Sequence, residues 1–166
     1  MKTLVIYGSR RGTTKYCAEL IGKTLGEESF IIDVNSKYIR SYLESYEQII
    51  IGANAFNFKL NRNVCSFIKR NLDIILEKRV YLYICCGAEE EKDTLSLYEN
   101  SYPSELLKKA ESMDNFGGCL DSSNESWLIK RILKRMKVND YDTMDENTVI
   151  QWTSKLENKL NKVLNG

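Results

Sequence analysis

Short apolar segments that alternate with amphipathic ones constrain the fold of this chain more than any other feature of its sequence. The clearest of them, residues 48–52, contains Ile49, Ile50 and Ile51 in succession. An uninterrupted apolar run of this length is typical of a parallel strand that is buried on both faces. Similar segments predict further strands at residues 2–7, 30–34, 79–86 and, around Phe116 and Cys119, within residues 115–120.

The segments between these strands carry apolar residues at helical spacing. They predict helices at residues 13–25, 61–76, 95–110, 127–137 and 145–164, with the third bent near Pro103. Neither an internal repeat nor a low-complexity linker interrupts the chain, so we expect a single domain over residues 1–166. Strands that alternate with helices indicate an α/β fold, in which helices cover both faces of a parallel sheet.

The composition excludes several classes of protein. The 24 basic and 23 acidic side chains give a net charge of +1, so no overall field favours a nucleic-acid partner. No apolar stretch approaches the roughly 20 residues that span a bilayer, and the first apolar run is too short for a secretory signal. The five cysteines show no CxxC spacing, and the chain has no histidine. We therefore expect a cytoplasmic protein without disulfides, metal or histidine-based catalysis.

Open parallel sheets bind ligands in the loops beyond the carboxyl ends of their strands, which here are residues 8–13, 53–60 and 87–93. Six residues of the first loop region lead into a predicted helix: Ser9, Arg10, Arg11, Gly12, Thr13 and Thr14. Hydroxyl groups, glycine and the free N–H groups of a helix start are what a phosphate group requires. The spacing matches neither the G-x-G-x-x-G motif nor the P-loop. Phosphate binding and simple helix capping by Ser9 and Thr13 are the two alternatives that the spacing leaves open.

The second loop carries two aromatic residues, Phe56 and Phe58, after the most apolar strand. Aromatic rings at the carboxyl edge of a sheet can stack on a planar ligand. They can equally well cover the apolar edge of the sheet, and the residues alone favour this second interpretation.

Several stretches of the sequence resemble one known family. The S-x-x-G-T-T loop after the first strand resembles the phosphate loop of flavodoxins. Residues 52–68 resemble a G-x-x-x-(aromatic)-x-G-K-L-N-x-N-V segment, and residues 116–121 match an F-G-G-x-L-D segment. Residues 127–136 are similar to an apolar–basic helix, and Trp152 has a counterpart in a closing helix. Over nearly its whole length the chain therefore resembles the flavodoxin-domain family that includes quinone-dependent protoporphyrinogen oxidases.

This resemblance implies a flavodoxin-like three-layer sandwich, with helices on both faces of a five-stranded parallel sheet of order 2-1-3-4-5. It also implies bound FMN, with its phosphate held by the hydroxyl groups and backbone N–H groups of the first loop, Arg10 and Arg11 included. The residues implied beside the isoalloxazine ring are Ala53, Asn54, Ala55, Phe56, Asn57, Gly87, Ala88 and Glu89. Two positions depart from the family: Phe58 stands where glycine is usual, and residues 87–91 offer no aromatic ring.

The function implied is that of an FMN-binding protein that carries electrons between redox partner proteins or to a quinone, without a catalytic residue of its own. Two alternatives stay open. One is an FMN-dependent, quinone-linked enzyme of the protoporphyrinogen oxidase type. The other is an interaction protein that keeps the flavodoxin fold without binding flavin, an alternative raised by Phe58 and by the acidic residues 89–91. The same acidic residues would lower the flavin reduction potential, unless they only complement the positive end of the following helix.

The segment from Trp127 to Lys137 carries five positive charges beside an apolar stripe. Such a helix can lie on an anionic membrane surface or bind an acidic partner. The chain would then sit peripherally on the inner face of the membrane. The alternative, which the pattern favours, is a helix packed on the domain with its basic face in water.

Overall fold

A parallel sheet of five strands forms the centre of the molecule. The computed structural model describes residues 2–56, 58–87, 91–135 and 137–164. The parallel strands are β1 (Thr3–Gly8), β2 (Ser29–Asp33), β3 (Gln48–Phe56), β5 (Arg79–Cys85) and β6 (Ser112–Asn115). They lie in the order β2-β1-β3-β5-β6, which confirms the predicted order 2-1-3-4-5.

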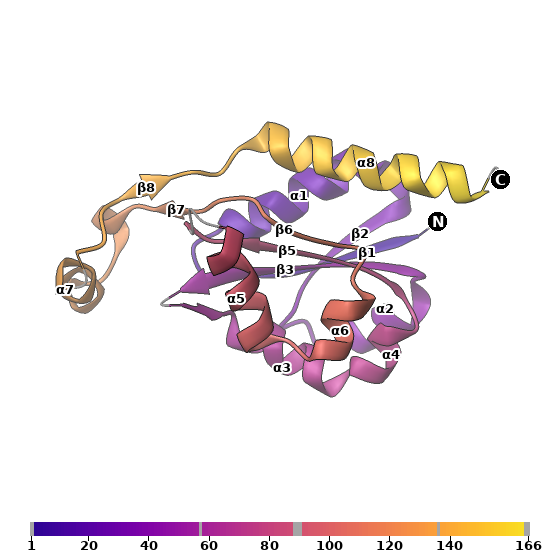
Figure 1. Ribbon diagram of the computed structural model, residues 1–166, viewed down its shortest axis with the longest axis horizontal. Coiled ribbons are helices and arrows are strands. Elements are labelled where there is room, and N and C mark those ends of the chain that lie inside the picture. Colours follow the sequence, from indigo (N-terminus) through magenta and orange to yellow (C-terminus); the bar gives the residue numbers. More distant parts are fainter. Residues whose placement is uncertain (1, 57, 88–90, 136, 165–166) are drawn as a thin grey trace.

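Helices cover both faces of this sheet (Figure 1). One face is covered by α1 (Thr13–Leu25), which the short turn η1 (Gly26–Glu28) follows, and by α8 (Glu146–Leu164). The helices of the other face are α2 (Ile39–Ser45), α3 (Arg62–Arg70), α4 (Leu72–Leu76), α5 (Glu91–Ser101) and α6 (Ser104–Lys109). The predicted three-layer α/β sandwich is therefore confirmed.

The sheet has one hydrophobic core on each face, and the three consecutive isoleucines of β3 contribute to both. Ile49 and Ile51 belong to the core beneath α2–α6, whereas Ile50 belongs to the core beneath α1 and α8. All three side chains are fully buried. Because successive side chains of a strand point to opposite faces, a strand between two helical layers must be apolar at every position.

Two predicted helices are each divided in the structure. The helix expected at residues 61–76 breaks at Asn71, whose buried side-chain Nδ2 donates to the carbonyl oxygen of Phe67 at 2.8 Å and so competes with the helical backbone bonds. The helix expected at residues 95–110 begins earlier, at Glu91, and is separated into α5 and α6 by Pro103, which lacks the N–H that an uninterrupted helix requires. Helix α2 was not predicted, because the segment around it, residues 35–47, is polar and rich in tyrosine.

The fifth parallel strand lies earlier than predicted. It is β6, whose residues are only half-buried and include Ser112, Asp114 and Asn115, so that no apolar run marks this edge strand. Residues 116–118 instead turn the chain away from the sheet, with Gly117 at a φ of 75°. The chain then forms β7 (Cys119–Leu120), which pairs antiparallel with β8 (Tyr141–Asp142) in a separate two-stranded sheet.

Residues 119–142 form an excursion beyond the carboxyl edge of the large sheet (Figure 1). Between β7 and β8 it contains the turn η2 (Ser122–Asn124) and helix α7 (Trp127–Arg135). Leu133 of α7 is buried, but Trp127, Leu128 and Ile132 keep 68%, 54% and 50% of their surface exposed. The apolar stripe therefore packs on the domain only in part, because Leu133 is buried and Ile129 half-buried whereas Leu128 and Ile132 are exposed.

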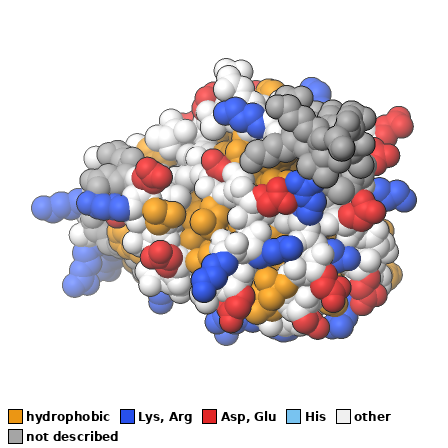
Figure 2. Space-filling model, turned by 45° about the vertical axis from the view of Figure 1, so that its right-hand side comes forward, with side chains coloured by type: hydrophobic (Ala, Val, Ile, Leu, Met, Phe, Trp, Pro, Cys, Tyr) orange, Lys and Arg blue, Asp and Glu red, His pale blue; other side chains and the backbone are white. Residues whose placement is uncertain are grey.

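Lys and Arg side chains project at the left-hand end of the molecule in Figure 2, which is the end where α7 lies in Figure 1. Among the described residues, no helix is both long enough and apolar enough to cross a membrane.

Substitution of Gly52 in β3 tests how tightly the sheet packs beneath α1. A Cβ atom on Gly52 would lie 2.0 Å from Cζ of the Tyr83 ring. We expect Gly52→Ala to lower the free energy of unfolding by about 1–3 kcal/mol, because a buried ring cannot move aside cheaply. Urea unfolding followed by circular dichroism measures this loss.

Gly22 of α1 is the matched control. Its added Cβ would meet the flexible end of Ile31, with Cδ1 at 2.5 Å, and alanine favours the helix. Gly22→Ala should therefore change stability much less than Gly52→Ala. Equal losses in the two variants would contradict this account of the packing.

Candidate functional site

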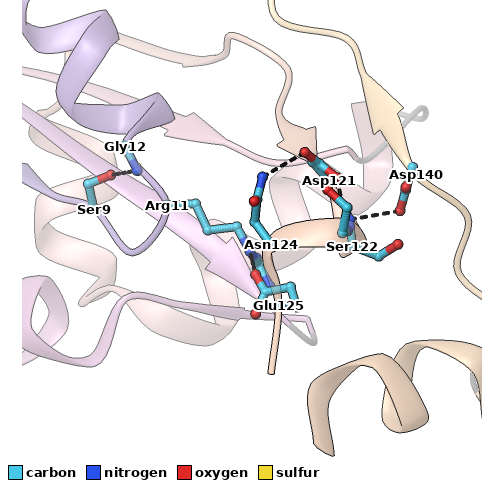
Figure 3. Close-up of polar contacts among 9 residues, drawn as sticks. Ser9, Arg11, Gly12, Asp121, Ser122, Asn124, Glu125 and Asp140 are labelled. Carbon is cyan, nitrogen blue, oxygen red and sulfur yellow. Dashed lines mark hydrogen bonds and ion pairs between the residues drawn. The ribbon is translucent and has the colours of Figure 1, made fainter. Parts of the chain in front are cut away.

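The loop between β1 and α1 presents hydrogen-bond donors at the carboxyl edge of the sheet. Gly12 has a φ of 99° and is the N-cap residue of α1. Its backbone N–H donates to Oγ of Ser9 at 3.0 Å, which closes the loop (Figure 3). No side chain caps α1, so the alternative in which Ser9 or Thr13 serves only as a helix cap is wrong. The uncapped first turn combines free N–H groups with the positive end of the helix dipole, which suits an anion.

Two polar atoms of this region are buried without a partner. The hydroxyl oxygen of Thr14 makes no hydrogen bond of normal geometry, although the residue is fully buried. Nη2 of Arg11 is likewise buried without a hydrogen-bond partner. A buried donor that lacks a partner destabilises the protein by about 1–3 kcal/mol, so both atoms indicate a place for a ligand oxygen.

Arg11 joins the loop to the excursion. Its Nε forms a short ion pair with Oε1 of Glu125, which lies between η2 and α7 (Figure 3). Only 22% of the Arg11 side chain and 13% of the Glu125 side chain are exposed. The guanidinium groups of Arg10 and Arg11 also lie over the Phe56 ring, at 4.5 and 5.1 Å from its centroid. The two arginines are therefore held by Phe56 and, for Arg11, by Glu125.

A small hollow of about 30 Å³ lies where these elements meet. Its lining includes five residues of the first loop region, Ser9, Arg10, Arg11, Thr13 and Thr14, and two residues of β3, Asn54 and Ala55. Cys85, Gly118, Cys119 and Tyr141 complete it. Two of the three predicted loop regions thus meet at one place.

The other residues implied as cofactor contacts lie around this hollow or away from it. Gly12 belongs to the same loop, and Phe56 lies beneath the two arginines. Ala53 is fully buried in the core beneath α2–α6 and does not line the hollow. Asn57, Ala88 and Glu89 fall outside the described residues, as does Glu90, whereas Glu91 begins α5.

The segment expected as a loop at residues 53–58 is mostly strand. β3 continues to Phe56 and turns back into the short antiparallel strand β4 (Lys59–Leu60). Asn61 fixes this hairpin, because its Nδ2 donates to Oδ1 of Asn54 at 2.8 Å. Phe58 has a φ of 56°, so it adopts the left-handed backbone that glycine favours at this position. Its side chain is 81% exposed and therefore does not cover the edge of the sheet.

The excursion contributes residues to the hollow that no sequence pattern predicted. Tyr141 of β8 packs against the backbone of Gly87, where an added Cβ would lie 2.6 Å from Cζ of the tyrosine ring. An aromatic ring thus stands beside the loop after β5, although that loop has none of its own. Nothing in the local sequence around Tyr141 or Glu125 marks them for this place, because only the pairing of β7 with β8 brings them there.

The titratable thiol and phenol groups of the hollow are neutral near pH 7. A hydrogen bond to Cys17 and burial raise the pKa of Cys85 well above its usual value, and the nearby Thr14 hydroxyl offsets this only in part. Burial raises the pKa of Tyr141. Burial and the carboxylates of Asp142, Asp121 and Asp140 raise the pKa of Cys119. Among the described residues, no three His, Cys, Asp or Glu side chains are grouped so as to hold a metal ion.

Solved structures with the same fold include two flavodoxins. Flavodoxin 1 from Bacillus cereus is 18% identical, with a TM-score of 0.61 over 93% of this chain and 95% of that protein. Flavodoxin 2 from Bacillus cereus is 20% identical, with a TM-score of 0.53 over 75% of this chain and 88% of that protein.

At the level of sequence, the chain is 31% identical over 116 residues to the flavodoxin-like domain-containing protein BilS of Clostridioides difficile (strain CD3). The match covers 68% of this chain and 58% of BilS. The sequence profile of the flavodoxin domain matches residues 4–147. The chain therefore belongs to the flavodoxin domain family.

Proposed function

We propose that this protein binds FMN at the hollow between the β1–α1 loop, β3 and β8, and that it carries electrons between redox partners. The observation that carries the proposal is the buried Nη2 of Arg11, which has no hydrogen-bond partner, beside the buried hydroxyl group of Thr14 and an uncapped helix start. Donors of this kind suit the phosphate group of FMN. Membership of the flavodoxin family supports the same cofactor, since the two Bacillus cereus proteins are flavodoxins.

Different residues of the site would bind different parts of FMN. The first turn of α1, the hydroxyl groups of Ser9, Thr13 and Thr14, and the Arg11 guanidinium would hold the phosphate. Tyr141 and Phe56 would border the isoalloxazine ring. Because the hollow of about 30 Å³ suits a water molecule rather than a phosphate, Arg10 and Arg11 must move away from Phe56 and Glu125 when the cofactor binds. Bound FMN supplies reversible electron transfer, while the chain fixes its orientation and potential.

The lining of the hollow suits an electron carrier. General acid–base catalysis would require a side chain that accepts protons near neutral pH. The described residues that line the hollow include no histidine, aspartate or glutamate, and Cys85, Cys119 and Tyr141 have raised pKa values. Arginine cannot accept a proton. Electron transfer between partners requires no such base.

Removal of the Arg11 guanidinium tests the cofactor site. In the wild-type protein, added FMN should lose its fluorescence in a saturable, stoichiometric titration. Arg11→Gln should raise the Kd for FMN about tenfold or more, because a hydrogen bond to a charged group contributes about 1.5–3 kcal/mol. Riboflavin lacks the phosphate, so its Kd should be the same for both proteins.

The exposed Arg131 of α7 provides a control for the loss of charge, since Arg131→Gln removes one positive charge away from the hollow. It should leave the Kd for FMN unchanged. If neither flavin is quenched by folded protein, the proposal fails and the interaction protein without flavin becomes the better account. If Arg11→Gln weakens riboflavin as much as FMN, the assignment of Arg11 to the phosphate is wrong.

The thiol of Cys119 provides an independent measurement at the same place. Its raised pKa means less thiolate at a given pH, so alkylation by iodoacetamide should be slow near pH 7 and accelerate at higher pH. Asp142→Asn removes one cause and should shift this rate profile to lower pH. Saturating FMN should protect Cys119, which lines the hollow, but not the half-buried Cys65. Equal protection of both thiols would count against the assigned site.

We also propose that α7 makes the peripheral contact of this carrier with an anionic membrane surface. Trp127, Leu128 and Ile132 are exposed on a helix that carries four basic side chains and no carboxylate. Tryptophan with aliphatic and basic residues suits the boundary of an anionic bilayer. Glu125 places this helix beside the cofactor loop through its ion pair with Arg11.

Sedimentation with liposomes tests this contact. Vesicles that contain phosphatidylglycerol should carry the protein down at low salt, whereas vesicles of phosphatidylcholine alone should not. Each Lys or Arg contributes about 1 kcal/mol near such a surface, so the double substitution Arg131→Gln and Arg135→Gln should lower the partition coefficient about thirtyfold. Lys108→Gln with Lys109→Gln, on the exposed surface of α6, is the control of equal charge. If the protein stays in solution with anionic vesicles at low salt, the membrane contact must be given up.

A further inference from the structure

A second and much larger hollow lies between α2 and α3, on the face opposite α1 and α8. Its volume is about 650 Å³, which is in the range of small-molecule sites. The loop after β2 and the two helices form it, and its lining residues are Val34, Asn35, Ser36, Ile39, Arg40, Arg62, Asn63, Ser66, Phe67, Arg70 and Asn71. We call it the α2–α3 groove. It shares no lining residue with the hollow at the β1–α1 loop.

The α2–α3 groove is strongly basic. Three arginines line it, Arg40, Arg62 and Arg70, and the lining contains no aspartate or glutamate. Arg40 forms an ion pair with Glu44 at 3.6 Å, but both side chains are largely exposed, so this pair is weak. Within the described part of the chain, no carboxylate forms an ion pair with Arg62 or Arg70. All three arginines are exposed, and an anion in the groove would meet three positive charges and no carboxylate of the lining.

Hydrogen bonds join the two walls of the groove. Nδ2 of Asn63, in α3, donates to Oδ1 of Asn35, in the loop after β2, at 2.7 Å. The backbone N–H and Nδ2 of Asn35 both donate to Oδ1 of Asp33 at 2.8 Å. Buried Val34 and Phe67 lie at the base of the groove. The groove is therefore held open by the fold, and a ligand need not order its backbone first.

We propose that the α2–α3 groove binds a ligand with a diphosphate group, held by Arg40, Arg62 and Arg70. The planar fork of each guanidinium matches two phosphate oxygens, and three arginines balance the charge of a diphosphate. The hydroxyl groups of Ser36 and Ser66 lie in the same lining and add neutral donors. This site goes beyond the proposed carrier function, because no residue of the cofactor hollow takes part.

Isothermal titration with inorganic pyrophosphate at fixed ionic strength tests the proposal on the full chain. We expect a saturable site that remains when Arg11→Gln removes the guanidinium of the cofactor hollow. The double substitution Arg62→Gln and Arg70→Gln should weaken binding by about tenfold or more for each guanidinium lost. Lys108→Gln with Lys109→Gln removes the same charge elsewhere and should leave the Kd unchanged. Arg11→Gln distinguishes the two sites, because it alters the cofactor hollow and should not affect pyrophosphate binding in the groove.

A second variant tests whether weaker binding is specific to the groove rather than a general effect of losing arginine. Ser66→Asp places a carboxylate on the wall of the groove, and it should weaken pyrophosphate without removing a cation. The proposal is overturned if pyrophosphate does not bind. It is also overturned if the double arginine and double lysine substitutions raise the Kd for pyrophosphate equally, or if Arg11→Gln alone raises it. Titration with ADP identifies the source of the phosphate: a lower Kd than for pyrophosphate indicates a nucleotide, and an equal Kd indicates that the diphosphate alone is bound. A failure of FMN to bind would leave each of these results intact.

Discussion

The side chain of Tyr83 connects the central sheet to the elements that form the candidate cofactor site. It extends from β5, is fully buried, and covers Gly52 of β3 so closely that no larger residue fits there. Its hydroxyl donates to the carbonyl oxygen of Thr14, in the first turn of α1, at 3.0 Å. Its ring stacks on Phe116 at 5.0 Å, just where the chain leaves β6 for the excursion. The positions of the loop donors and of the excursion therefore both depend on the packing of one ring in the core.

The excursion contributes both to the hollow and to the exposed surface. It supplies Tyr141 to the hollow and Glu125 to Arg11, and the same segment carries the exposed basic helix α7. A contact made by α7 would consequently lie close to the proposed cofactor. If Arg11 binds the phosphate group as proposed, its ion pair with Glu125 would link cofactor binding to the position of the excursion, because one guanidinium cannot satisfy both groups in the same geometry.

Much of the fold was predictable because it depends on local pattern. Buried parallel strands must be apolar at successive positions, and Ile49, Ile50 and Ile51 made β3 plain before the structure was known. The edge strand β6 was misplaced for the same reason, since its half-buried residues include Ser112, Asp114 and Asn115 and form no apolar run. The break after α3 depends on the side chain of one asparagine, which the periodicity of the sequence does not show. The break between α5 and α6 lies at Pro103, where the sequence predicted a bend.

The sequence by itself determined the α/β class and the position of the loop from Ser9 to Thr14 before α1, because strand burial and helix starts have local signatures. The order of the parallel strands was implied by the resemblance to flavodoxins, not by any local pattern. The tertiary structure alone decided that Tyr141 stands against Gly87, that Glu125 holds Arg11, and that the arginines of α2 and α3 surround one groove. Each of these contacts joins residues from separate elements. Their meeting depends on how helices pack and how the chain crosses between strands, and no local spacing records that.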